Sequence, residues 1–287
     1  MWLIFAICSA VFAGLTSILA KCGLQEVDST VATAFRTVVA MVFAWIIVLI
    51  SGSYAQIDSI DADTWIFLIL SGLATGASWL CYFKALQLGD VNKVVPVDKS
   101  STVMAIMLAI IFLGETLSIP GIFGVVLILV GTILMIEKKD VKGMESKGSS
   151  WLLFAIGSAV FAALTSILGK VGMEGIDSNL GTAIRTVVVL GMSWIMIYVS
   201  HKQSRIHGIK RRDMTFIILS GLATGASWMF FFGALQMGPA SVIIPIDKLS
   251  ILVTIAFSYI VFREKLTKKS AIGLAGVVAG TLLLLLR

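Results

Sequence analysis

Apolar runs of about twenty residues, each long enough to cross a bilayer as a helix, alternate with short polar segments along the chain. We predict ten such runs. They lie at residues 2–21, 30–50, 65–87, 92–113 and 118–136 in the first half and 151–170, 179–199, 214–236, 241–262 and 268–286 in the second. The pattern predicts an all-α integral membrane protein with ten transmembrane helices.

The second half of the chain repeats the first. Residues 2–136 realign without a gap on residues 151–285, and roughly half of the positions are identical. The segment from Ser71 to Trp79 returns unchanged as Ser220 to Trp228. Since one unit is used twice, every candidate residue in one half has a counterpart to examine in the other.

The odd number of spans in each repeat decides the architecture. A second copy of a five-span unit enters the membrane from the opposite side, and the two copies form an inverted-topology repeat, as in many secondary transporters. We therefore expect five-helix domains at residues 1–136 and 151–287, joined by a charged linker at 137–150.

Loop charges favour the same inversion. Residues 52–64 carry three aspartates and no base, whereas their counterpart, residues 201–213, carries five lysines and arginines. Because cytoplasmic loops are enriched in these bases, residues 137–150, 201–213 and 263–269 are expected in the cytoplasm. Both termini are then extracytoplasmic, and we expect the membrane to be a bacterial inner (plasma) membrane.

Composition excludes several functions. The chain is 58% hydrophobic and 13% charged, whereas soluble domains carry about 25% charged residues. Only two histidines occur, His201 and His207, and all three cysteines lie in the first half. We therefore expect no metal, no cofactor and no enzymatic activity. The net charge of +6 lies mainly in loops, which indicates contact with membrane lipids rather than nucleic acid.

Four local features together resemble the EamA-type repeat of the drug/metabolite transporter superfamily. They are Ala20-Lys21 ending helix one, Arg36 early in helix two, a helix three rich in small residues, and Gly114-Glu115 ending helix four. The resemblance covers nearly the whole chain. It implies ten helices, a central cavity between the halves, alternating access, and export or exchange of small metabolites. Ten-helix members usually have cytoplasmic termini, whereas the loop charges here indicate the reverse.

Charges inside the apolar runs are the first candidates for function. A charge at the centre of a membrane helix costs about 2.5–3.5 kcal/mol. The second half repeats all four charges of the first, which are Lys21, Arg36, Asp98 and Lys99, as Lys170, Arg185, Asp247 and Lys248. They either bind substrate and gate a cavity or have structural roles. In the structural interpretation the lysines at 21 and 170 reach the membrane surface, and Arg36–Asp98 and Arg185–Asp247 form ion pairs.

A proline precedes each Asp-Lys pair. Pro96 and Pro245 remove a backbone donor, which predicts that helix four is kinked or begins afresh there; alternatively each proline lies in a first helical turn. Because the repeats are inverted, we expect Asp98–Lys99 and Asp247–Lys248 at opposite rims, as inner and outer gates.

Helices one and three supply the remaining candidates. The hydroxyls of Thr16 and Thr165 can bind substrate or their own i−4 carbonyls. Trp79 and Trp228 lie at mid-span, where a tryptophan of the interfacial belt would not, and can line the cavity. Small residues four apart on helix three are typical of close helix packing. Glu115 and its repeat counterpart end helix four as surface or gate groups.

These features favour a secondary transporter, an exporter or exchanger of small polar or amphipathic metabolites, active as a monomer of two pseudo-symmetric halves. One alternative is a flippase for a lipid-linked headgroup. Another is a proton-coupled multidrug exporter, which is disfavoured because helix one lacks a carboxylate, although Asp98 and Asp247 are candidates for the proton role. A membrane enzyme or sensor is disfavoured because the sequence shows no His, Cys or Ser constellation.

Overall fold

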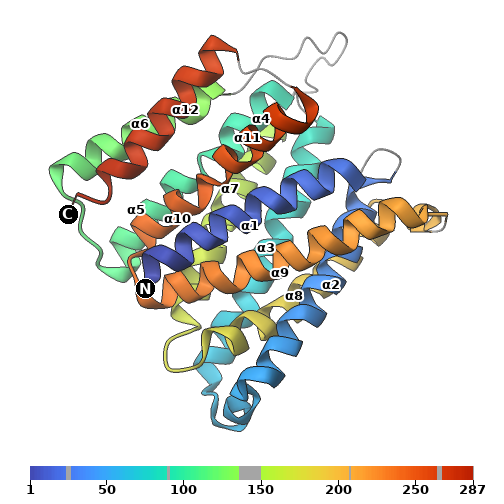
Figure 1. Cartoon of the computed structure of the whole chain (residues 1–287). Coiled ribbons are helices and arrows are strands. Elements are labelled where there is room, and N and C mark those ends of the chain that lie inside the picture. Colours follow the sequence, from blue (N-terminus) through green and yellow to red (C-terminus); the bar gives the residue numbers. More distant parts are fainter. Residues whose placement is uncertain (24–26, 89–90, 136–149, 207, 264–266, 287) are drawn as a thin grey trace.

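The chain is almost entirely α-helical (Figure 1), and the computed structural model describes every residue except 24–26, 89–90, 136–149, 207, 264–266 and 287. The first half forms α1 (Trp2–Gly23), α2 (Ser29–Ser51), the 3-10 helix η1 (Ser53–Ser59), α3 (Ala62–Leu88), α4 (Val91–Lys99), α5 (Ser101–Leu113) and α6 (Ile119–Met135). The second half forms α7 (Ser150–Val171), α8 (Ser178–Val199), the 3-10 helix η2 (Gln203–Ile206), α9 (Arg211–Met237), α10 (Ala240–Lys248), α11 (Ser250–Phe262) and α12 (Lys268–Leu283). The predicted linker at 137–150 lies almost wholly outside the described residues.

The protein is an integral membrane protein of the all-α class. Among the described residues, seven helices are long and apolar enough to cross a membrane: α1, α2, α3, α7, α8, α9, and the segment Ala240–Phe257 of α10 and α11. α6 is apolar but shorter, so the count of ten spans stays a prediction. Large apolar side chains on the outer surface, such as Ile50, Phe123 and Ile260, are more than half exposed. Such a surface suits a lipid environment.

Equivalent aspartates start the second helix of each repeat. The Asp28 carboxylate accepts a hydrogen bond from the backbone N–H of Thr30, and that of Asp177 accepts from Asn179 and Leu180. Each cap satisfies backbone donors that have no partner inside the helix. The caps explain why α2 and α8 begin at corresponding positions.

The two repeats pack on each other more than on themselves. α1 lies along α9, and its counterpart α7 lies along α3. Equivalent helices also pair directly: α6 with α12 at one edge of the molecule and α2 with α8 at the opposite edge (Figure 1). Because exchanging the two repeats reproduces these pairings, the fold has pseudo-two-fold symmetry.

Equivalent helices run in opposite directions where they meet. In α6 and α12, Gly124 lies against Gly280, and Gly131 lies against Gly273. A Cβ at Gly131 would lie 2.5 Å from the Gly273 carbonyl oxygen, so only glycine permits this approach. In α2 and α8 the rings of Phe35 and Trp194 meet at 6.1 Å, and the start of α2 lies near the end of α8.

The small residues of α3 and α9 have the packing role that their spacing predicts. Gly72 and Gly76 of α3 lie against Val188 and Met192 of α8, where a Cβ would come within 2.7 and 2.3 Å of their side chains. Gly221 of α9 lies in the same way against α2. Close approach of the helices therefore holds the candidate site between the repeats.

The fourth helix of each repeat is divided, but not at its proline. Pro245 lies inside α10, and the division falls at Leu249, whose N–H donates to the Ile246 carbonyl at 2.9 Å. The equivalent division is at Ser100, whose N–H donates to the Val97 carbonyl at 3.2 Å. Three-residue hydrogen bonds of this kind tighten a helix locally. The break therefore follows each Asp-Lys pair instead of preceding it, which corrects the sequence expectation.

Candidate functional site

Each intramembrane aspartate is held by a serine of the other repeat. Ser9 of α1 donates to Asp247 Oδ1 at 2.6 Å, and Ser158 of α7 donates to Asp98 Oδ1 at 2.7 Å. Each of these serines also lies 3.4 Å from a second one, Ser227 on α9 or Ser78 on α3. The same Asp-Ser-Ser network thus occurs twice, and in each copy residues of both repeats take part.

The predicted ion pairs between arginine and aspartate are wrong. Arg185 donates from Nε to Ser71 Oγ at 3.2 Å and from Nη2 to Thr75 Oγ1 at 2.8 Å. Its guanidinium carbon lies 4.1 Å from the ring centroid of Phe232. In the described part of the chain, neither Arg185 and Asp247 nor the equivalent Arg36 and Asp98 form an ion pair.

The ion pairs do not form because the helices that carry the arginine and the aspartate pack against different neighbours. Arg185 is on α8, which packs against α3, so its side chain reaches the hydroxyls of α3. Asp247 is on α10, which packs against α1, so its carboxylate reaches Ser9. Sequence spacing within one repeat does not reveal these neighbours, because they belong to the other repeat.

Arg185 belongs to a buried polar column. The Thr75 hydroxyl lies 3.2 Å from that of Thr165, which also donates to its own i−4 carbonyl on Phe161. Trp228 contributes its ring, with its centroid 5.7 Å from the guanidinium carbon. The structure therefore brings three predicted site residues, Arg185, Thr165 and Trp228, into one cluster.

The equivalent cluster around Arg36 is arranged differently. Thr224 donates to Thr16 at 3.4 Å, and Ser220 donates to the Thr16 carbonyl at 3.1 Å, which matches the other repeat. Arg36 itself, however, is half-buried and makes no hydrogen bond to a described side chain, whereas Arg185 is 1% exposed. Trp79 and its counterpart Trp228 are both half-buried.

The two lysines of the Asp-Lys pairs lie toward the centre of the molecule. The start of α10 lies at Glu115, just beyond α5, and α10 runs back along α5, which brings Lys248 toward Lys99. Each pair lies about two turns inside the helix that carries it, and the placement of the pairs as gates at opposite rims stays a prediction.

Glu115 connects the ends of three helices at one end of the bundle. Its carboxylate accepts hydrogen bonds from the backbone N–H groups of Ala240 and Ser241, at 2.7 and 2.9 Å, and from the Ser241 hydroxyl at 2.5 Å. Lys170 completes the contact with an ion pair at 3.4 Å and a hydrogen bond to the Gly238 carbonyl. Lys170 is thus a bridging residue of this rim, which we call the Glu115 rim. Glu264, the counterpart of Glu115, lies outside the described residues.

Burial and hydrogen bonding act in opposite directions on Glu115. Burial raises the pKa of this carboxyl, but the hydrogen bonds from Ser241 and Ala240 and the charge of Lys170 outweigh it, so its pKa is below the ordinary value. A hollow of about 530 Å³ adjoins the contact. It is lined by Phe112, Leu113, Glu115, Lys170, Val171, Glu174 and Pro239.

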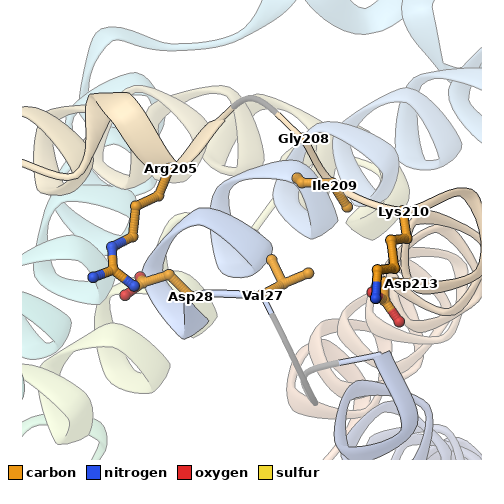
Figure 2. A pocket seen from close by; sticks show the side chains of 7 residues that line it. All are labelled: Val27, Asp28, Arg205, Gly208, Ile209, Lys210 and Asp213. Carbon is orange, nitrogen blue, oxygen red and sulfur yellow. The ribbon is translucent and has the colours of Figure 1, made fainter.

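The opposite end carries a different ion pair. Lys202 bonds to Asp28 Oδ1 and to the Thr30 hydroxyl, each at 2.9 Å. Burial raises the pKa of Asp28, but Lys202 and the helix N–H groups outweigh it and lower the pKa. A hollow of about 240 Å³ lies beside this pair, and Figure 2 shows Arg205 extending toward Asp28 and Lys210 beside Asp213 across it. We call this end the Lys202 rim.

The sequence did not single out the residues that bind Arg185. Ser71, Thr75 and Phe232 recur as Ser220, Thr224 and Phe83 in the other repeat. The i, i+4 spacing of Ser71 and Thr75 places both hydroxyls on one helix face, a signal that could have found them. Within the described residues, no three His, Cys, Asp or Glu side chains gather as metal ligands.

A two-repeat helical membrane protein with paired polar clusters between the repeats belongs to the class of membrane transporters rather than enzymes. The chain belongs to the EamA-like transporter family, whose model matches residues 1–137 and 149–286. Each match corresponds to one repeat of the fold.

Individual relatives agree with this family. An uncharacterized transporter in the cobO 3'region of Sinorhizobium sp. is 46% identical over 134 residues, 47% of this chain and 95% of that protein. Human solute carrier family 35 member G1 is 28% identical over 287 residues, covering 96% of this chain and 76% of that protein. A solved crystal structure of a protein has a TM-score of 0.74 at 16% identity and covers 97% of this chain and 94% of that one. It shows the same fold.

Proposed function

We propose that the protein is a secondary transporter, an exporter or exchanger, that moves small polar or amphipathic metabolites by alternating access. One observation carries the proposal: identical residues in the two repeats have different surroundings. Arg185 is sealed against Ser71 and Thr75, whereas Arg36 is half-buried and lacks the matching bonds to Ser220 and Thr224. Since the arginine and its two hydroxyl partners are the same residue types in both repeats, we assign the difference to the conformation.

The proposed arrangement is an inverted repeat of two five-span halves. The antiparallel packing of α6 on α12 and of α2 on α8 supports it, because a two-fold axis that reverses helices lies in the membrane plane. Such repeats open alternately to the two sides by exchanging conformations. In the opposite state, Arg36 is sealed against Ser220 and Thr224, and Arg185 is released.

The bound carboxylate at the Glu115 rim supports a closed mouth there. Three hydrogen bonds and an ion pair join the end of α5 to the start of α10 and to α7. The substrate site in this proposal is central. It is formed by the Asp98–Lys99 and Asp247–Lys248 pairs, with Arg36, Arg185, Thr16, Thr165, Trp79 and Trp228 along the walls.

We propose the orientation of the protein in the membrane from the charges of its loops. Residues 201–213 belong to the Lys202 rim, and their five bases favour the cytoplasmic side. The Glu115 rim and both termini are then extracytoplasmic, and the protein lies in a bacterial inner membrane. We further propose that one chain is the functional unit, because the helices of each repeat pack chiefly on the other repeat.

The test has two stages. Purified protein is first screened for thermal stabilisation by a panel of small metabolites, since a ligand at 100 times its Kd adds about 2.7 kcal/mol. Hits are then measured by counterflow in proteoliposomes. We expect saturable movement of at least one solute and its loss in Asp98→Asn or Asp247→Asn. Scrambling of labelled lipid without solute counterflow would instead identify a flippase.

A further inference from the structure

Lys99 and Lys248 form no ion pair with any residue that the structure describes. Lys99 is the last residue of α4, and Lys248 is the last residue of α10. Both side chains are exposed, and neither makes a hydrogen bond or an ion pair with any residue that the structure describes. Because charged side chains within transmembrane segments are rare and face the bundle interior or a water-filled cavity, lysines there without an ion-pair partner are candidates for a functional site.

Among the described residues, the neighbouring aspartates form no ion pair with these lysines. Asp98 and Asp247 turn their carboxylates to Ser158 and Ser9, at 2.7 and 2.6 Å. Adjacent residues on an α-helix project about 100° apart, so each lysine points away from the serine that holds its aspartate. The carboxylates are thus fixed on the helix packing faces, and the ammonium groups remain available.

The pseudo-two-fold symmetry brings the two available ammonium groups toward each other. α10 begins beside Glu115 and runs back along α5, so its last residue approaches the start of α5, next to Lys99. Like charges at such a place repel each other, and the repulsion is stronger where water is scarce. An anion between them would neutralise both charges at once.

We infer that the central site of the proposed transporter takes a small organic or inorganic dianion, such as a dicarboxylate or a phosphate, held between Lys99 and Lys248. The claim that the dianion is transported rests on the proposed function, whereas binding of the dianion can be tested by itself. An ammonium group is a compact point charge without the fixed fork of a guanidinium. The site therefore selects charge and size, and either anion type satisfies it.

The test measures thermal unfolding of the purified chain with succinate, inorganic phosphate, acetate or choline at constant ionic strength. We expect succinate or phosphate to raise the unfolding midpoint saturably, and acetate and choline to have little effect. Lys99→Gln and Lys248→Gln should each weaken dianion binding about tenfold or more, as expected for the loss of a charge-assisted contact. Lys84→Gln, which removes an exposed lysine of α3, should leave binding unchanged.

Stability without ligand separates a binding role from a structural one. Removal of an unpaired charge should leave the midpoint of each Lys→Gln variant equal to or above that of the unaltered chain. If the variants unfold, the lysines are structural and the inference is wrong. If choline or a neutral solute stabilises and is transported while dianions are inert, the substrate class is wrong but the transporter remains. If a dianion binds at the lysines without counterflow, the transport proposal fails instead.

Discussion

At the scale of single residues, the most informative side chain is Arg185, which is buried yet has no acidic partner in the described residues. Its donors bind the hydroxyls of Ser71 and Thr75, and its plane lies near the ring of Phe232. Guanidinium groups suit such sites because they are weakly hydrated and stack on aromatic rings. Hydroxyl partners hold the charge less firmly than a carboxylate, which suits a contact that breaks in the proposed transport cycle.

The arginine contact can be isolated by comparing equivalent serines. Ser71→Ala should destabilise the protein by about 1–3 kcal/mol more than Ser220→Ala, because it leaves a donor of a buried charge without its partner. Both serines also donate to a backbone carbonyl of the other repeat. Because each variant loses this bond, its contribution cancels when the two variants are compared. Thermal unfolding in one detergent measures the difference. Equal losses would show that the Arg185 bond contributes nothing to stability.

The lowered pKa of Glu115 predicts how the stabilising effect of its contacts changes with pH. Because its folded-state pKa lies below the ordinary value of 4.5, its stabilising effect is complete above that value. The effect is lost as pH falls through the lowered folded-state pKa. Only the thiolate reacts with thiol reagents, so each rate is divided by that of free cysteine at the same pH. On this scale a single cysteine at Val171, beside the adjoining hollow, should be shielded at neutral pH and more accessible in acid below 4.5.

Two variants complete the Glu115 test. Glu115→Gln should make the Val171 cysteine reactive already at neutral pH, because an amide lacks the charge that Lys170 and the helix N–H groups bind. Asp28→Asn removes a similar carboxylate at the Lys202 rim and should change nothing at Val171. If Glu115→Gln leaves the reactivity unaltered, the carboxylate does not close this mouth. In this conformation Glu115 is ionised at neutral pH and cannot carry a coupling proton.

At the scale of helices, glycine spacing determines how closely the repeats approach. Along α6 and α12, Gly124 and Gly131 face Gly280 and Gly273, so the two backbones come into direct contact. Gly191 of α8 differs, because a Cβ there would meet nothing within 4 Å. A side chain at Gly131 would therefore clash with the facing helix, whereas a side chain at Gly191 would not.

The same substitution at these two glycines should act with opposite sign. Gly131→Ala places a Cβ 2.5 Å from the Gly273 carbonyl oxygen, which forces α6 and α12 apart and should cost about 1–3 kcal/mol. Gly191→Ala should stabilise by up to about 1 kcal/mol, because alanine favours a helix interior more than glycine does. Thermal unfolding of both variants checks the pair. A stable Gly131→Ala would mean that α6 and α12 do not pack this closely.

At the scale of the whole molecule, the two repeats are copies in different conformations. The symmetric parts are the Asp-Ser-Ser networks and the threonine contacts, which occur twice with similar distances. The asymmetric part is the seal around Arg185, which is missing around Arg36. In the proposed alternating-access cycle, the symmetric networks and the asymmetric seals correspond to one of the two states that the repeats exchange.

The orientation of the repeats can be read with two equivalent cysteines. Ala55 of η1 and Ser204 of η2 occupy matching positions in the two repeats and are exposed. In a background without Cys8, Cys22 and Cys81, Ala55→Cys should react with an impermeant reagent in intact cells, and Ser204→Cys should react only after lysis. Reaction of both from one side would rule out the inverted topology. The reverse pattern would keep the topology and place the termini in the cytoplasm.

The sequence by itself determined the helices and the repeat. Runs of apolar residues define helices because the bilayer imposes a fixed length and leaves no backbone group unpaired. The predicted and observed bounds accordingly agree within a few residues for nearly every helix. The gapless repeat likewise located the polar pairs, since Asp98 and Asp247 occupy corresponding positions in the two halves.

Only the tertiary structure decided which groups meet and which repeat is sealed. Asp247 bonds to Ser9, and Arg185 bonds to Ser71 and Thr75, because antiparallel repeats place helices of one half against the opposite half. Spacing along one helix specifies a face but not the neighbour that covers it. The different burial and hydrogen bonding of Arg36 and Arg185 are even harder to predict from the sequence. The arginines and their hydroxyl partners are identical in the two repeats, so these residues alone do not specify which arginine is sealed.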